Sequence, residues 1–599
     1  MSIRDVQKAS GSCPEVVGTY SEFWGSLHHG GLLSLQGVLS ARMRSPARAE
    51  VAANLAVDEM PRGERGLPRE KSPRRSQKSE FGCRRTTTVD SLTTANILSR
   101  QPSILVTPRR ATSSSSSAFF RSHFRRLNES QAPSATRKVT AGVPANHKAR
   151  TEPLQEYFEA LVAERQCSGL KVKPDAQHGK GVYSEVDFQE DDLVLKDEML
   201  VGAQHSSNKI DCLVCSFCFR FIGSIELQIG RKLYLQELGV SAVDDCGSSD
   251  GIGCSTSSEK TRIPQDAIQS LMNSSLRLPY SENFPLPSVV PCLGGCKEAY
   301  YCSKSCAEAD WGSFHSLLCI GHGSSSPNTE ALLKFMKHAN ETNDIFILAA
   351  KVISFTILRY KKLKAAHAQR EGKHDSSNQF DGCIIPLLLE AWKPVSMGFK
   401  RRWWDCIALP EDVDPSEEVE FRMQIKDLAF ESLQLLKEAI YDKECAPLFS
   451  LDIYGHIIGM FELNNLDLVV ASPVEDYFLY IDDLPLSQKK EAENLTKPFL
   501  DALGDDYSIS CQGTAFFPLQ SCMNHSCIPN AKAFKRRDAY QRMFQDKDGQ
   551  ATIVALRPIF KGEEITISYI DEDLPYDERQ ELLADYGFRC KCPRCIEEP

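Results

Sequence analysis

The chain has 599 residues, of which 42% are hydrophobic and 25% charged, a composition typical of a protein with a sizeable core and more than one domain. Its formal net charge is −10, but the charge is unevenly distributed. Residues 1–150 are basic, with 24 Lys and Arg against 11 Asp and Glu, whereas the remaining residues are acidic, with 46 Lys and Arg against 69 Asp and Glu. An acidic body argues against a protein that holds nucleic acid by charge. It suits a basic peptide partner, although a merely solvated acidic surface explains the charge equally well.

Residues 1–150 are rich in Ser, Arg, Thr and Pro and lack apolar periodicity, so we expect a disordered basic arm there. Residues 100–150, with many Arg and Ser and almost no acid, have the composition of a transit peptide. They lie far from Met1, however, and the first 30 residues carry acidic side chains and no apolar core of a secretory signal. We therefore expect an intracellular, reducing environment, with organelle targeting as the minority interpretation.

Folded structure is expected from about Glu152. Residues 154–162 form an amphipathic stretch. A strand-like run at 170–172 is followed by the segment 178–184, whose glycines predict a turn between two strands. The longest apolar stretch, Ile345 to Leu358, contains Lys351 and is too short to span a bilayer. It predicts a buried helix, and we expect no membrane association.

Residues 329–445 show a helical pattern, with apolar side chains predicted on one face at Leu332, Leu333, Phe335 and Met336. From Ser450 onward the pattern changes to short runs typical of strands, at 457–461, 552–556 and 565–570. Strands near both ends, with helices and a cysteine-rich block between them, predict one β-domain split by insertions.

About half of the 22 cysteines lie in two clusters with short, metal-like spacings. In a reducing compartment such clusters indicate metal ligands rather than disulfides. The mid-chain cluster consists of four close pairs, which together supply the eight ligands that two tetrahedral zinc sites need: Cys215 and Cys218, Cys292 and Cys296, Cys302 and Cys306, His315 and Cys319.

The first half of this cluster leaves alternatives open. Cys212 forms a competing pair with Cys215. Between Cys218 and Cys292 lie 73 residues, among which Cys246 and Cys254 are rival ligands. Buried free thiols are a further interpretation of the front pairs.

The C-terminal cluster, Cys590, Cys592 and Cys595, offers only three ligands, whereas a closed structural zinc site has four. The candidate for the fourth is Cys527, in the segment Asn-His-Ser-Cys-Ile-Pro-Asn of residues 524–530. A second motif, Gly-Glu-Glu-Ile-Thr-Ile-Ser-Tyr at residues 562–569, lies between Cys527 and the terminal cysteines.

These motifs together resemble a SET domain with its post-SET zinc loop, and the segment from Cys302 to Cys319 resembles a MYND finger. From about Glu152 to Pro599, three quarters of the chain, the sequence is similar to SET-and-MYND-domain lysine methyltransferases of the plant trithorax-related type. The resemblance implies a mainly β SET fold of small sheets with a knot-like C-terminal crossing, split by a MYND-type finger and an α-helical insertion.

The resemblance also implies the order of the domains. The disordered arm (1–150) would precede the N-terminal part of the SET domain. A zinc finger with a long insertion, a helical insertion, the SET core and the post-SET loop would then follow, at residues 151–210, 211–320, 321–450, 451–573 and 574–599.

By the same resemblance, the cofactors are S-adenosylmethionine and about three zinc ions. In a MYND finger the first and third pairs share one ion and the second and fourth pairs share another. This pairing implies three ligand sets: Cys215, Cys218, Cys302 and Cys306; Cys292, Cys296, His315 and Cys319; Cys527, Cys590, Cys592 and Cys595.

The implied reaction moves a methyl group from the sulfonium of S-adenosylmethionine to a lysine ε-amine. The amine must be neutral to attack, although its pKa in solution is about 10.4. A desolvated channel beside a positive sulfonium lowers that pKa, because both effects disfavour the ammonium. In the family, the tyrosine that ends the second motif points into this channel, so Tyr569 is the predicted catalytic residue, as a base or as an orienting group. The alternative is a tyrosine that only packs at the end of a strand.

Other positions match cofactor contacts of the family. Asn524 and His525 match residues that bond to the cofactor, and Gly179, Lys180 and Gly181 match a Gly-x-Gly turn that lets the backbone approach it. Asn464, with Asn465 as a one-residue rival, matches a further contact. Phe588, beside Tyr586, matches an aromatic that stacks on adenine. His525 has ordinary packing as its alternative, and so have Tyr586 and Phe588, which could seat the zinc loop.

The family's leading substrate is histone H3, so we expect a basic histone tail as partner and a nuclear location, with the cytoplasm as an alternative. MYND modules of the family bind short proline-containing peptides. A rival hypothesis is therefore an interaction adaptor with an idle SET domain, and a third is a methyltransferase of a non-histone protein.

Overall fold

A computed structural model describes residues 148–175, 179–238, 262–371, 384–398, 401–410, 413–533 and 547–598. The predicted arm, 1–150, lies outside the described residues apart from the first three residues of α5 (Lys148–Glu164), the helix predicted at 154–162. Cys246 and Cys254 also lie outside them. In the described ranges no helix is long and apolar enough to cross a membrane.

The sheet that organises the site joins segments from both ends of the ordered chain. Its strands are β1 (Leu170–Asp175), β2 (Gly179–Ser184), β12 (Glu564–Ile567) and β9 (Asn524–His525), in that order. β2 pairs antiparallel with β1 and with β12, whereas β9 runs parallel to β12. The strands predicted around the glycine turn are therefore confirmed, and the strand predicted at 565–570 is confirmed as far as Ile567, where β12 ends. The knot-like crossing stays a prediction.

Three further small sheets complete the strands. One has the order β10 (Ala531–Ala533), β11 (Ala551–Ala555) and β3 (Leu193–Asp197), which confirms the strand predicted at 552–556. The next has the order β4 (Val201–Gln204), β8 (Cys511–Phe516) and β7 (Asn465–Val470). The last is the hairpin of β5 (Val290–Pro291) and β6 (Tyr300–Tyr301) in the cysteine-rich region.

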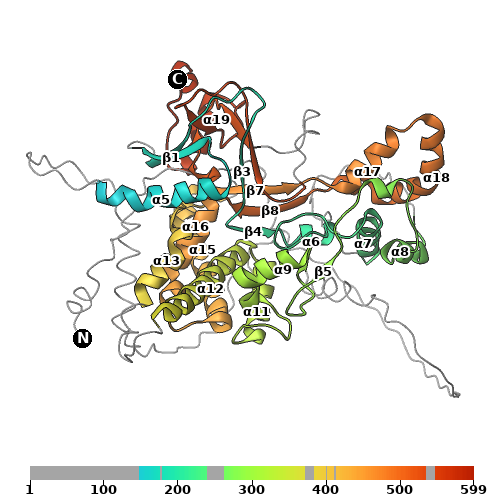
Figure 1. The fold of residues 1–599 in the computed structure, drawn as a ribbon, viewed down its shortest axis with the longest axis horizontal. Helices are drawn as coiled ribbons and strands as arrows, with labels where there is room; N and C mark the ends of the chain where they lie inside the picture. The colour runs from blue at the N-terminus through green and yellow to red at the C-terminus, as the bar shows by residue number, and fades with distance from the viewer. Residues whose placement is uncertain are drawn as a thin grey trace, which may run out of the picture.

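The helical block predicted at 329–445 is present below the sheets (Figure 1). It consists of α11 (Thr329–Glu341), α12 (Ile345–Glu371), α13 (Ile384–Ser396), α14 (Trp403–Cys406) and α15 (Glu418–Ile440). The predicted buried helix is α12. On α11, Leu332 and Phe335 are buried, but Leu333 is 49% exposed, so its predicted place on the buried face is wrong. A step of one residue turns a helix by about 100°, which carries Leu333 out of that face.

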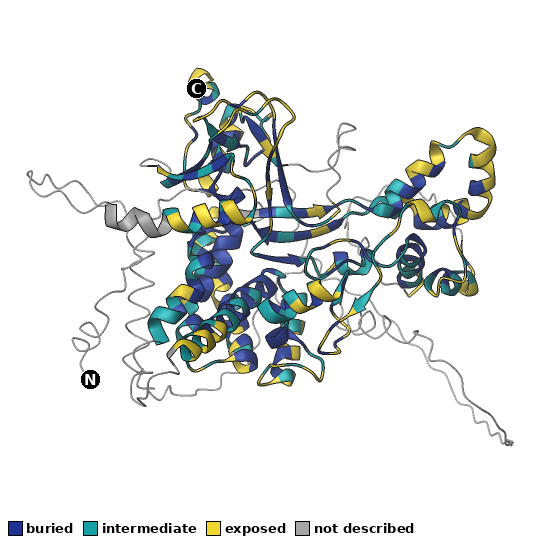
Figure 2. Ribbon diagram, viewed as in Figure 1, coloured by how far each residue is buried: buried dark blue, intermediate teal, exposed yellow. Residues whose placement is uncertain are grey.

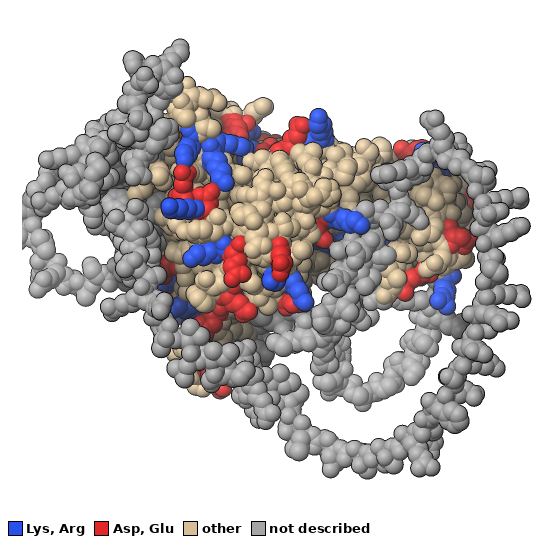
Figure 3. All heavy atoms as spheres, turned by 90° about the horizontal axis from the view of Figure 1, so that it is seen from below, with Lys and Arg blue, Asp and Glu red and all other residues tan. Residues whose placement is uncertain are grey.

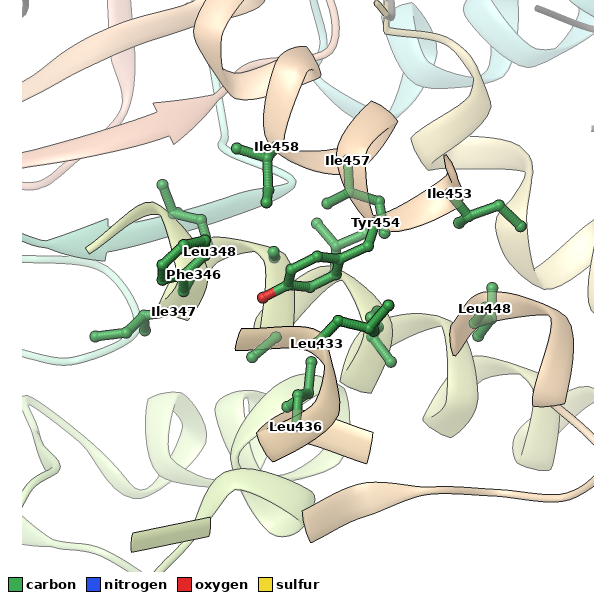
Figure 4. Close-up of a cluster of buried hydrophobic side chains, with 14 of the residues drawn as sticks. Phe346, Ile347, Leu348, Leu433, Leu436, Leu448, Ile453, Tyr454, Ile457 and Ile458 are labelled. Carbon is green, nitrogen blue, oxygen red and sulfur yellow. The ribbon is translucent and has the colours of Figure 1, made fainter. Parts of the chain in front are cut away.

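The strand predicted at 457–461 is wrong, because these residues lie in the middle of helix α16 (Leu451–Asn464). Every residue from Ile457 to Asn464 is buried, so this half of the helix has no exposed face and shows no helical period in its sequence. Figure 4 shows Tyr454 and the isoleucines of α16 between Leu433 and Leu436 of α15 and residues of α12.

Helices also occur where the sequence predicted a finger or a sheet. They are α6 (Asn208–Asp211), α7 (Ile225–Glu237), α8 (Gln265–Met272), α9 (Lys304–Asp310), α10 (Ser316–Leu318), α17 (Pro473–Asp482), α18 (Leu486–Leu503), α19 (Tyr576–Asp585) and α20 (Pro593–Glu597). α7, α8, α17 and α18 pack into a separate helical lobe with a core of its own (Figures 1 and 2). More of the described residues are therefore in helices than in strands, and the expectation of a mainly β fold is wrong; the small SET-type sheets are present within a largely helical chain.

Candidate active site and zinc centres

The first metal-ligand group joins the turn before α7 to the start of α9. The side chains of Cys215, Cys218, Cys302 and Cys306 lie within 4.8 Å of one another. The Sγ of Cys302 is 3.6 Å from that of Cys218 and 3.5 Å from that of Cys306. Ser303 caps α9 by accepting a hydrogen bond from the Cys306 N–H at 3.1 Å, which fixes the last ligand.

The second group joins the loop of the β5–β6 hairpin to the π-helical turn Trp311–His315 and the end of α10, which follow α9. It brings together Cys292, Cys296, His315 and Cys319, again within 4.8 Å. The Sγ atoms of Cys292 and Cys319 are 3.8 Å apart, and Cys296 Sγ is 3.2 Å from His315 Nε2. Three residues separate Cys292 from Cys296. The last of them, Gly295, has a φ of 73°, which a residue with a side chain rarely adopts.

The third group lies at the C-terminus and contains the predicted fourth ligand. Cys527 joins Cys590, Cys592 and Cys595 within 4.8 Å, and its Sγ is 3.4 Å from that of Cys595. Helix α19 holds this group through Gln580, whose amide nitrogen donates to Cys595 Sγ at 3.3 Å and whose oxygen accepts from the Cys590 N–H at 3.1 Å. No spacing rule for zinc ligands points to Gln580, so the sequence did not indicate it.

The donor sets of all three groups fit zinc. Four thiolates, or three thiolates and one imidazole, are the usual ligands of structural zinc. For a Zn–S bond of about 2.3 Å, tetrahedral geometry places neighbouring sulfurs roughly 3.8 Å apart, close to the distances found here. The cysteines in the described ranges are free thiols rather than disulfides. The rival Cys212 lies outside the three groups, with its thiol 3.5 Å from the carbonyl of Ile509.

The motifs at residues 524–530 and 562–569 meet at the edge of the sheet, where β9 runs beside β12. The N–H of Tyr569 donates to Nδ1 of His525 at 3.1 Å, and the Tyr569 hydroxyl donates to the carbonyl of Met523 at 2.7 Å. The other ring nitrogen of His525 is 3.3 Å from Cys527 Sγ. His525 thus connects the tyrosine directly to the third zinc group.

Aromatic rings enclose this point. The ring of His525 is 5.1 Å from that of Tyr569 and 5.9 Å from that of Phe588, and Tyr586 is 5.6 Å from Tyr569. The hydroxyl of Tyr586 is buried and has no hydrogen-bond partner among the described residues. The sequence treated Tyr586 only as a packing residue; its unpaired hydroxyl makes it a candidate for the site.

Burial raises the pKa of Tyr569 well above its ordinary value, as it does for Tyr586. Both phenols are therefore neutral at physiological pH. A neutral phenol bonds to an amine without becoming a strong base, so the geometry favours orientation by Tyr569 over proton removal.

The Gly-x-Gly segment, predicted as a turn, is instead the start of strand β2, where Gly181 lies against Asn524. A side chain at Gly181 would come within 3.1 Å of the Asn524 amide nitrogen and within 2.5 Å of the Glu564 carboxylate. The Asn524 amide donates to Glu564, and its Oδ1 is buried with no partner among the described residues. Such a cradle suits a ligand with hydrogen-bond donors. Glu564, within the Gly-Glu-Glu motif, was not singled out from the sequence.

The remaining predicted cofactor residues have partners within the protein. Gly179 begins β2 with a φ of 79°. The buried Lys180 ammonium lies 2.5 Å from the carbonyl of Met397 and 5.2 Å from the ring of Phe158. Asn464 ends α16, where its amide donates to the Met460 carbonyl at 2.9 Å, and its rival Asn465 begins β7.

A buried carboxylate two residues before Asn464, that of Glu462, should make the stability of the protein depend on pH. Glu462 accepts a hydrogen bond from Trp403 Nε1 at 3.2 Å, and burial raises its pKa to about 7. Because the folded-state pKa lies above the unfolded value, the stabilising contribution of the neutral form is complete below about pH 4.5 and is lost as the pH rises through about 7.

We therefore expect Glu462→Gln, which keeps the acceptor for Trp403, to be more stable than the wild type at pH 8 by on the order of 3 kcal/mol. The difference should shrink to nothing near pH 4.5. Thermal unfolding of both proteins at each pH measures it, and comparison at equal pH removes the effect of protonated zinc ligands. A difference that stays constant with pH would show that Glu462 does not titrate as described.

Known protein families contain the same motifs as this chain. A model of the SET domain matches residues 429–570, and a model of the MYND finger matches residues 286–319. The histone-lysine N-methyltransferase ATXR2 of Arabidopsis thaliana is 64% identical over 460 residues, which cover 75% of this chain and 94% of that protein.

More distant relatives carry other names. The protein-lysine N-trimethyltransferase SMYD5 of Gallus gallus is 25% identical over 358 residues, 56% of this chain and 72% of that protein. SMYD5 of Mus musculus is 23% identical over 456 residues, 73% of this chain and 89% of that protein.

The fold and the site define a SET-domain protein that carries a MYND-type zinc finger. The chain belongs to the family of SET-and-MYND-domain protein-lysine methyltransferases, which use S-adenosylmethionine.

Proposed function

We propose that this chain transfers methyl groups from S-adenosylmethionine to lysine side chains of a histone, with histone H3 as the first candidate. The observation that carries the proposal is the meeting of Asn524, His525 and Tyr569 at one edge of a sheet, beside a zinc group that holds Phe588 close to them. The relative that is 64% identical is named a histone-lysine N-methyltransferase, which supports the histone as substrate and a nuclear role.

In this proposal S-adenosylmethionine supplies the electrophilic methyl group. Asn524 and the start of β2 at Gly179–Gly181 hold its polar end, while Phe588 packs on its adenine. Lys180 and Asn464 join them as cofactor contacts. Tyr569 orients the lysine amine, and the aromatic rings exclude water from the channel.

The acidic charge of residues 151–599 favours a basic tail and speeds its approach. On the face drawn in Figure 3 the acidic and basic side chains lie mixed. Among the described residues, that face therefore offers no single acidic patch for a basic tail, and the proposed attraction of the tail rests on the net charge. Proline-containing peptides are a second proposed class of partner, for the MYND finger.

The domain division is part of the proposal. The MYND match begins after Cys215 and Cys218, yet both lie in the first metal group, which supports a finger that starts near residue 211. The SET match reaches back to residue 429 and so includes most of α15. We keep the proposed divisions at 151–210, 211–320, 321–450, 451–573 and 574–599.

The test is transfer of tritium from labelled S-adenosylmethionine to core histones. Label in histone H3 supports the proposal. Absence of label from a protein with its full zinc content contradicts the histone substrate, and calorimetric binding of S-adenosylmethionine then separates two accounts. Retained binding indicates a non-histone lysine, whereas lost binding indicates the adaptor with an idle SET domain.

A further inference from the structure

Asp197, at the end of β3, has a fully buried side chain that the reaction as described does not use. Its Oδ2 accepts hydrogen bonds from the backbone N–H groups of Leu519 at 2.7 Å and Gln520 at 3.0 Å. The carboxylate therefore holds the start of the short 3-10 turn η8 (Gln520–Cys522), more than 300 residues further along the chain.

That turn leads straight into the site. The next residue, Met523, supplies the carbonyl that accepts the Tyr569 hydroxyl at 2.7 Å. Asn524 follows in β9, where it pairs with Thr566 of β12. A shift of the turn would therefore move the partner of the catalytic tyrosine and the proposed cofactor contact together.

The second oxygen of Asp197 forms an ion pair with Arg165 at a distance too long for a hydrogen bond. Its Oδ1 is 3.7 Å from Nε of Arg165, and neither atom has a hydrogen-bond partner among the described residues. Arg165 is anchored in turn by Glu198, whose Oε2 lies 2.5 Å from Nη1. Burial raises the pKa of Asp197 to about 6, whereas the two N–H groups and Arg165 favour its ionised form. At neutral pH the carboxylate is thus charged and held in place.

We propose that Asp197 is a positioning residue for methyl transfer, which fixes the turn at Gln520–Cys522 so that Met523 and Asn524 meet the tyrosine and the cofactor correctly. The inference rests on the proposed role of Tyr569. It gives a role in catalysis to a residue of β3, a strand that lies outside all of the sequence motifs.

The experiment compares Asp197→Ala and Asp197→Asn with Glu226→Ala. Glu226 is the matched control, because it is a buried carboxylate that accepts a backbone N–H at 3.1 Å and a hydroxyl, in the separate helical lobe. For each variant, kcat, the KM for S-adenosylmethionine, the zinc content and the Tm are measured.

We expect Asp197→Ala to lower kcat by about a hundredfold, as small misplacements of a site do, and to raise the KM for S-adenosylmethionine, with zinc content unchanged. Asp197→Asn should recover most of the activity, because its amide oxygen can still accept both N–H groups. Glu226→Ala should lose stability but keep the wild-type kcat.

Wild-type kcat in Asp197→Ala would overturn the inference. So would an Asn variant no better than Ala, or an equal loss of kcat in Glu226→Ala at an equal loss of Tm. If the wild type itself transfers no methyl group, the proposed function fails instead. The affinity of Asp197→Ala for S-adenosylmethionine then decides the inference, because Asn524 follows the same turn.

Discussion

Replacing Cys595 by alanine should abolish both cofactor binding and methyl transfer. The third metal group has only four ligands, Cys527, Cys590, Cys592 and Cys595, and a structural zinc site with three is incomplete. The same group holds His525, 3.3 Å from Cys527, and the segment that carries Phe588. Loss of the ion should therefore release the tail and the aromatic wall together, since metal binding and folding are coupled.

Zinc content and calorimetric binding of S-adenosylmethionine measure this effect. We expect about two zinc ions per chain instead of about three, and no measurable cofactor binding. The control is Cys445→Ala, which removes a fully buried thiol outside the three metal groups. Retention of the third zinc ion, or of normal cofactor affinity without it, would contradict the proposed coupling.

Tyr569→Phe should lower kcat by about a hundredfold while the affinity for S-adenosylmethionine stays within about twofold of the wild type. The substitution removes only the hydroxyl, which bonds to Met523, and leaves the ring against His525 and Tyr586. Alignment of the amine is lost, whereas the cofactor contacts remain.

The matched control for that substitution is Tyr454→Phe. Tyr454 is also a fully buried tyrosine, whose hydroxyl lies 2.9 Å from Ser432 in the helical core (Figure 4). Single-turnover rates with labelled cofactor should fall for Tyr569→Phe and stay normal for Tyr454→Phe. Equal rates for the two variants would show that the Tyr569 hydroxyl takes no part in methyl transfer.

Several parts of the architecture follow from local sequence. The two strands around the glycine turn depend on β-type residues and a left-handed glycine, Gly179, within one short segment. The long apolar run at α12 is too short for a membrane and folds as the expected helix. Close cysteine pairs indicate metal ligands because both side chains can reach one ion from a single turn.

Spacing alone does not decide which pairs share an ion. Cys218 and Cys302 are 84 positions apart, yet their sulfurs lie 3.6 Å from each other. The family resemblance implied this pairing, and the tertiary structure brings the side chains together while leaving Cys212 outside.

The proportion of helix, by contrast, was decided by tertiary packing. From Ile457 to Asn464, α16 is buried on every side, so its apolar run has neither a helical nor a strand period. Packing against α12 and α15 fixes its form. Asp197, Glu462 and Tyr586 belong to no motif. Their importance comes from burial and from partners far along the chain, such as Leu519 for Asp197 and Trp403 for Glu462.

The sequence by itself therefore determined the class of chemistry, because metal ligands and motif residues must be particular residue types at short spacings. Tertiary structure alone decided which carboxylates are buried and which distant groups they bond to, as for Asp197 and Glu462. Burial and long-range hydrogen bonds arise only when segments such as β3 and the turn before β9 are packed together.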